Sequence, residues 1–229
     1  MTMRTHHLLA AGLWAFAAAA SMAQPSVCSS DGVARPVAVV ERFINADCDD
    51  CWRDPKTPTP AANELVLDWI VPGSKGEDAP LSMGASRDGL ARLAALGRKP
   101  PAQADSARTG VARAGPKLRI AHGESFNDYV GTSIELSPGH GGPWDAWLLL
   151  VEVLPAGAEG SPVARNLVRN AFQPAWGLRR QLSKEEQRRL HESRPMRIAD
   201  GARRERLRLV AVVHDARGRI VAATQSRCE

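Results

Sequence analysis

The chain has 229 residues, of which 44% are hydrophobic, and a formal net charge of +5 at pH 7. This length is enough for one large domain or two small ones. Beyond the N-terminal residues no segment is apolar enough to cross a bilayer, so the composition excludes a membrane span in the mature chain.

The N-terminus has the three parts of a cleavable signal peptide. Arg4 supplies a positive start, residues 8–20 form an uncharged apolar run, and small residues stand at Ser21 and Ala23. The run is shorter than a membrane-spanning helix, which needs about 20 residues. We therefore expect cleavage after Ala23, removal of residues 1–23, and a periplasmic or secreted protein. Since an exported protein rarely meets nucleic acid, we expect no nucleic-acid partner and interpret the arginines as a solvated surface.

Four cysteines follow, at positions 28, 48, 51 and 228. An even number in an oxidising compartment suggests two disulfides, and four cysteines allow three pairings. Cys48 and Cys51 are close in sequence, whereas Cys28 and Cys228 lie at the two ends of the mature chain. Because domain termini are often close in space, the sequence favours Cys48–Cys51 together with Cys28–Cys228.

The first half of the mature chain combines strands with one helix. Residues 37–43 predict a short buried strand, the CxxC motif follows it, and three prolines within residues 54–60 exclude a regular helix there. Residues 65–71 predict a second strand. The apolar spacing of residues 78–96 predicts a helix, and the polar, proline-rich segment 100–115 predicts a linker or exposed loop.

The second half is rich in predicted strands. They cover residues 118–121, 128–136, 144–154 and 163–172, and 144–154 is the most apolar of them. Ser183 to Glu186 forms a capping box that predicts a helix to about Glu192. Residues 206–214 and 219–223 predict a hairpin with a glycine in its turn.

A strand followed at once by CxxC is typical of thiol–disulfide oxidoreductases, in which one thiol attacks and the other resolves the mixed disulfide. Residues 39–51, which read V-V-E-R-F-I-N-A-D-C-D-D-C, resemble the opening of an uncharacterised family of exported bacterial thioredoxin-like proteins. That family reads V-V-E-L-F-T-S, two residues, then C-S-S-C-P-P. Residues 65–69, the segment 147–172 and the closing hairpin through Gln225 also resemble the family.

The resemblance implies an α+β fold with a thioredoxin-like N-terminal half and a mostly antiparallel β C-terminal half. Residues 24–115 are then a degenerate thioredoxin-like βα region, and residues 116–229 are a β-rich region that ends in the hairpin. The resemblance also implies catalytic roles for Cys48 as nucleophile, Cys51 as resolving thiol and Asp68 as a buried proton-transfer group. Alternatively, Asp68 faces solvent on the other side of its strand.

The chain departs from the family in the residues around the CxxC motif and at the cis-proline position, on which thiol–disulfide exchange depends. The prolines remove the helix that follows the second cysteine, and Gly115–Pro116 is the nearest candidate for the cis-proline of thioredoxins. Four aspartates surround the thiols, at positions 47, 49, 50 and 54. Each nearby carboxylate disfavours a thiolate, so the sequence predicts a slow nucleophile at neutral pH.

Two functions therefore stay open. One is weak or specialised thiol–disulfide chemistry at Cys48 and Cys51, with exported protein thiols as partners. The other is a non-catalytic envelope protein, binding or structural, in which Cys48–Cys51 is a structural disulfide. A metal held by the cysteine pair is a third interpretation, but the histidines lack a ligand spacing, and we expect neither a metal nor a cofactor.

Overall fold

The computed structural model describes residues 28–177 and 182–228, so the predicted signal peptide at residues 1–23 lies outside the described part of the chain. Strands make up 44% of the structure and helices 17%, the short 3-10 turns included. The fold is thus β-rich, and the predicted α+β fold with a thioredoxin-like N-terminal half is wrong.

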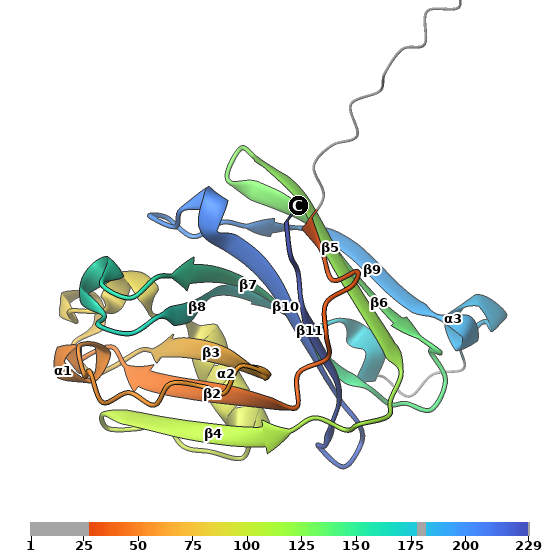
Figure 1. The fold of residues 1–229 in the computed structure, drawn as a ribbon, viewed down its shortest axis with the longest axis horizontal. Coiled ribbons are helices and arrows are strands. Elements are labelled where there is room, and N and C mark those ends of the chain that lie inside the picture. Colours follow the sequence, from red (N-terminus) through yellow and green to blue (C-terminus); the bar gives the residue numbers. More distant parts are fainter. Residues whose placement is uncertain (1–27, 178–181, 229) are drawn as a thin grey trace, which may run out of the picture.

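The strands form two sheets (Figure 1). The large sheet has the order β11 (Ile220–Gln225), β10 (Leu207–His214), β7 (Asp145–Leu154), β8 (Arg165–Phe172), β3 (Glu64–Val71), β2 (Ala38–Asn45) and β4 (Ala104–Gly110). The small sheet has the order β1 (Cys28–Ser29), β5 (Lys117–Phe126), β6 (Tyr129–Ser137) and β9 (Leu190–Arg197). The large sheet therefore takes strands from both sides of residue 115.

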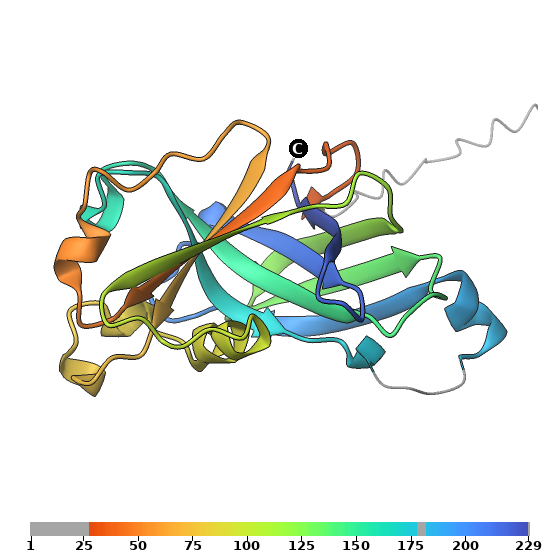
Figure 2. The same ribbon diagram turned by 90° about the horizontal axis from the view of Figure 1, so that it is seen from below.

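The helices are short. The α-helices are α1 (Asp49–Trp52), α2 (Arg87–Ala95) and α3 (Lys184–Arg188). The 3-10 turns are η1 (Gly76–Asp78), η2 (Ser82–Gly84), η3 (Ala158–Gly160), η4 (Ala175–Gly177) and η5 (Arg204–Arg206). In Figure 1, α1 and α3 lie at opposite ends of the molecule, and Figure 2 shows α2 against one side of the large sheet. Within the described residues, no helix has the length and apolar character of a membrane span.

The inner strands of the large sheet are buried on both faces, and this burial explains why β7 is its most apolar strand. On β7, Leu148 and Leu150 face a core shared with the small sheet, whereas Leu149 and Val151 face a second core beneath α2. A strand covered on both faces reads as a continuous apolar run instead of an alternating one. The predicted strand at residues 144–154 is confirmed as β7. It is apolar throughout because its side chains fill a core on each face of the sheet.

Two predicted non-strand segments form strands instead. The expected linker at residues 100–115 contains β4, which pairs antiparallel with β2 at the edge of the large sheet. Its side chains alternate between exposed and half-buried, so its composition stays polar. The predicted helix from Ser183 has its capping box but ends at Arg188, and β9 begins at Leu190. In both places backbone pairing with a distant strand decides the structure.

The predicted helix of residues 78–96 is shorter than expected but ends where expected. It begins after Ser86, whose hydroxyl accepts from the Asp88 N–H at 3.0 Å, because residues 76–84 form 3-10 turns. Gly97 follows the helix with a φ of +67°, and the Arg98 N–H donates to Leu93 O. This is the glycine-terminated end that the sequence indicates. The C-terminal hairpin is confirmed as β10 and β11.

Candidate functional site

Both predicted disulfides are present, Cys48–Cys51 and Cys28–Cys228. Cys48–Cys51 lies in the connection from β2 to β3, residues 46–63, which we call the disulfide loop. The Cys48 N–H donates to Asn45 O at 2.9 Å, and both cysteines are partly exposed. Cys51 also packs against a small core at this end of the sheet, which includes Ile70.

The helix behind the disulfide is only four residues long. It ends at Arg53, and Pro55 follows shortly after. A helix dipole builds up from many aligned peptide units, so a single turn gives a thiolate at Cys48 little stabilisation. The structure thus agrees with the expectation that the prolines remove the helix on which thioredoxin chemistry depends.

The aspartates near the disulfide are mostly engaged in contacts of their own. Asp47 accepts from the backbone and hydroxyl of Ser74, and the hydroxyl contact is the main reason that the pKa of Asp47 is lowered. Asp49 forms an exposed ion pair with Arg53 at 2.7 Å. Asp54 accepts from the Lys56 N–H at 2.9 Å. These partners reduce the repulsion that the sequence predicts at the thiols.

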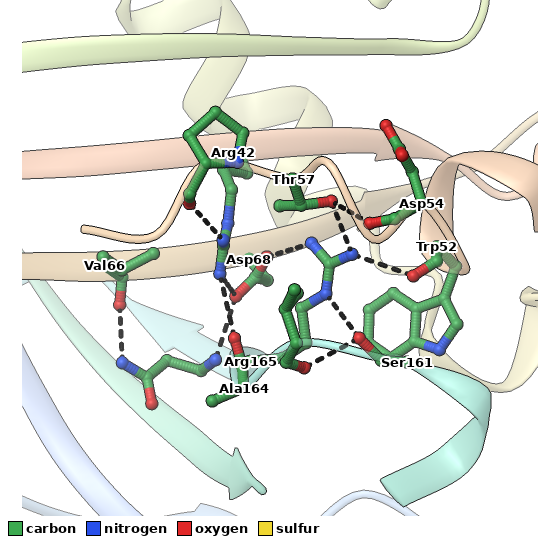
Figure 3. Close-up of polar contacts among 12 residues, drawn as sticks. Arg42, Trp52, Asp54, Thr57, Val66, Asp68, Ser161, Ala164 and Arg165 are labelled. Carbon is green, nitrogen blue, oxygen red and sulfur yellow. Dashed lines mark hydrogen bonds and ion pairs between the residues drawn. The ribbon is translucent and has the colours of Figure 1, made fainter. Parts of the chain in front are cut away.

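Asp68 is fully buried in β3, on the sheet face away from α2, so the solvent-facing interpretation is wrong. Its carboxylate accepts from Arg42 Nη2 at 2.7 Å, from Arg165 Nη1 at 3.1 Å and from the Asn166 N–H at 2.9 Å (Figure 3). We call Arg42, Asp68 and Arg165 the Asp68 cluster. The carboxylate is fully occupied by donors from the protein.

Arg165 ties the Asp68 cluster to the disulfide loop. Its guanidinium donates to Trp52 O at 2.9 Å and to Thr57 Oγ1 at 3.2 Å, and its Nε donates to Ser161 Oγ at 2.9 Å. The guanidinium carbon lies 4.9 Å from the centre of the Trp52 ring (Figure 3). Burial lowers the pKa of Arg165; the charge of Asp68 opposes this effect, and that of Arg42 adds to it. The Arg165 side chain thus links β8 to the disulfide loop.

Arg42 also contacts both the disulfide loop and the segment before β8. It stands opposite Asp68 in the parallel pairing of β2 with β3, and it donates long hydrogen bonds to Pro58 O and Ala164 O, both at 3.4 Å. The side chain is 9% exposed, and its Nε has no hydrogen-bond partner among the described residues. A buried guanidinium N–H without an acceptor is costly, and such groups are rare in native structures.

A pocket of about 280 Å³ opens beside Arg42. We call it the Arg42 pocket. Its wall comes from the disulfide loop, the start of β8 and the end of β11, and includes Pro58, Thr59, Pro60, Val163, Ala164, Asn166 and Gln225. Arg42 and Arg165 carry two positive charges against the single charge of Asp68. Glu64 also lines the pocket, and it forms an ion pair with Arg108 at 2.7 Å.

A second buried ion pair lies on the opposite face of the sheet. Glu41 accepts two hydrogen bonds from Arg92 of α2, each at 2.8 Å, and a third from Trp69 Nε1 at 3.1 Å. Arg92 also contacts His214 Nε2 at 3.3 Å. The neighbouring residues Glu41 and Arg42 therefore point to opposite faces of β2, and each finds a buried partner of opposite charge.

The sequence analysis named Asp68 and the cysteines as candidate site residues. It did not predict that Arg42 and Arg165 are the ion-pair partners of Asp68. The available signal was a charged pair, Glu41-Arg42, inside an otherwise apolar strand. The cis peptide bonds of the described residues, Ser137–Pro138 and Gly142–Pro143, lie in the connection from β6 to β7. Gly115–Pro116, the candidate from the sequence, is therefore not a cis-proline site.

The geometry thus joins three elements: a partly exposed disulfide, a buried ion cluster that anchors its loop, and a pocket lined by the two arginines of that cluster. Comparison with protein-family models, with curated proteins and with solved structures finds no match for the chain.

Proposed function

We propose that this protein is a non-catalytic binding protein that takes a small anionic ligand, such as a carboxylate, in the Arg42 pocket. The observation that carries this proposal is the buried Nε of Arg42, a charged donor without an acceptor beside a pocket of about 280 Å³. Because Nε is buried, a carboxylate in the pocket would displace the groups that cover this N–H, accept its hydrogen bond and offset the excess positive charge of the Asp68 cluster.

In this proposal Cys48–Cys51 is a structural disulfide. The disulfide loop in which it lies supplies the pocket residues Pro58, Thr59 and Pro60, and Arg165 anchors this loop through Trp52 O and Thr57. The features that favour a reactive thiol are weak: α1 has a single turn, and Asp68 is already bound by two arginines. Export to the periplasm or beyond is part of the same proposal, and two disulfides are compatible with it.

Ligand binding is tested with Arg42→Lys, which keeps a cation beside Asp68 but removes the Nε donor. We expect malonate to change the tryptophan fluorescence of the wild-type protein, because Trp52 stacks on Arg165. Arg42→Lys should weaken this binding at least about tenfold, the effect of losing a hydrogen bond between charged groups.

Arg119→Gln is the matched control for charge, because Arg119 is an exposed arginine paired with Asp31. It should leave the malonate affinity unchanged. Two results would contradict the proposed ligand site: no saturable response of the wild-type protein to malonate, or equal affinities for Arg42→Lys and Arg119→Gln.

The role of the disulfide is tested by its reduction potential. We expect Cys48–Cys51 to have a potential below about −300 mV, as structural disulfides do. Redox titration followed by thiol alkylation and mass mapping measures it separately from Cys28–Cys228. The protein should show no disulfide reductase activity. A potential in the range of catalytic pairs, together with reductase activity that Cys48→Ser abolishes, would favour thiol–disulfide chemistry instead.

A further inference from the structure

The second disulfide has a histidine beside it. In the antiparallel pairing of β1 with β5, Cys28 stands directly opposite His122. A bridge between Ser29 and Arg227 brings Cys228 to the same place. The two sulfur atoms and a ring nitrogen of His122 all lie within 4.8 Å of one another. Three residues from distant parts of the sequence thus present two sulfurs and one nitrogen to a common point.

One ring nitrogen of His122 has a hydrogen-bond partner and the other has none within the described part of the chain. Its Nδ1 lies 3.2 Å from Gly123 O, and since a carbonyl oxygen only accepts, Nδ1 carries the proton. The Nε2 lone pair is therefore free. The side chain is only 6% exposed, and Nε2 has no hydrogen-bond partner among the described residues. Histidine ligands typically donate their second ring N–H to a carbonyl in this way.

We propose that reduction of Cys28–Cys228 converts this point into a Zn²⁺ site with Cys28, Cys228 and His122 as ligands. A dithiol reductant supplies two electrons and two protons, so it becomes a disulfide while Cys28 and Cys228 become thiols. Binding of Zn²⁺ then releases the two thiol protons to solvent. In the oxidised form the sulfurs are bonded to each other and the site is closed.

The geometry fits zinc after a small movement. Tetrahedral coordination with Zn–S bonds of about 2.3 Å places two sulfurs about 3.8 Å apart, so the two sulfurs, which are bonded to each other here, must move apart after reduction. A water molecule would complete the coordination, and His122 also lines an open groove of about 530 Å³ between β5, β6 and β9. The site is separate from the Arg42 pocket, so its test is independent of the proposed function.

The experiment uses the Cys48→Ser/Cys51→Ser variant, which removes the other thiol pair. The protein is reduced, freed of reductant without oxygen, and titrated with Zn²⁺ against a chromophoric chelator. We expect one Zn²⁺ per reduced chain and none per oxidised chain. His122→Gln should weaken binding at least about tenfold. His191→Gln, at an exposed position on β9, is the matched control and should bind like its parent.

Co²⁺ provides a direct view of the ligands, because thiolate-to-metal charge-transfer absorption should appear in the reduced protein and disappear in Cys228→Ser. Zn²⁺ should also raise the melting temperature of the reduced protein and slow alkylation of Cys28 and Cys228. The proposal is overturned if the reduced protein, whether folded or not, binds no stoichiometric Zn²⁺. Equal affinities for His122→Gln and His191→Gln would overturn it as well.

Discussion

Replacing Cys28 and Cys228 together with serine should lower the free energy of unfolding by about 5 kcal/mol. The disulfide joins residues 200 positions apart, so it restricts nearly the whole unfolded chain. In the folded protein the same ends are held by the pairing of Ser29 with Arg227, where each residue donates a backbone hydrogen bond to the other. Urea unfolding followed by tryptophan fluorescence measures the loss.

The matched comparison is Cys48→Ser/Cys51→Ser. This disulfide closes a loop between residues only three positions apart, and the same chain-entropy relation gives about 2 kcal/mol. The two double variants remove the same atoms, but their effects should differ by about 3 kcal/mol. Equal losses would mean that unfolded-state entropy is not what distinguishes the two disulfides.

Asp68→Asn should destabilise the protein by about 3–5 kcal/mol, because it leaves the buried guanidinium groups of Arg42 and Arg165 without their counter-charge. Chemical unfolding monitored by circular dichroism measures this effect. Glu41→Gln provides a parallel case on the opposite face of the sheet, where Arg92 is equally buried and should lose its only carboxylate partner among the described contacts.

The control is Asp49→Asn, which breaks the exposed ion pair with Arg53 and should change stability by no more than about 0.5 kcal/mol. A loss of less than about 1 kcal/mol for Asp68→Asn would contradict the role of the Asp68 cluster as an anchor. It would mean that solvent reaches Arg42 and Arg165 once the carboxylate is neutral.

The Asp68 cluster also bears on function. Burying three charges is costly, and a well-packed apolar replacement often stabilises a protein as much as an ion cluster does. The cluster is therefore better explained by what it positions. Arg165 holds the disulfide loop at Trp52 and Thr57, and Arg42 presents an unused donor beside the pocket. Both observations agree with the proposed ligand site.

Features that depend on local patterns or on the chain ends could be predicted from the amino-acid sequence. Apolar runs marked β7 and the β10–β11 hairpin, and the capping box marked the start of α3. The positions of the four cysteines were enough to predict both disulfides. The prolines after the CxxC correctly indicated that the helix there would be short, because proline removes a donor and blocks a helical turn.

The fold class and the surroundings of Asp68 depend on contacts between distant parts of the chain and could not be predicted. The strands β4 and β9 have polar, partly exposed side chains, so their backbone pairing with β2 and β6 leaves no apolar pattern to read. The sequence shows that Asp68 is a carboxylate within a predicted strand. Its burial, however, depends on Arg165, 97 residues away, and on the disulfide loop. Local periodicity reports which side of a strand a residue occupies; what covers that side is set by long-range contacts.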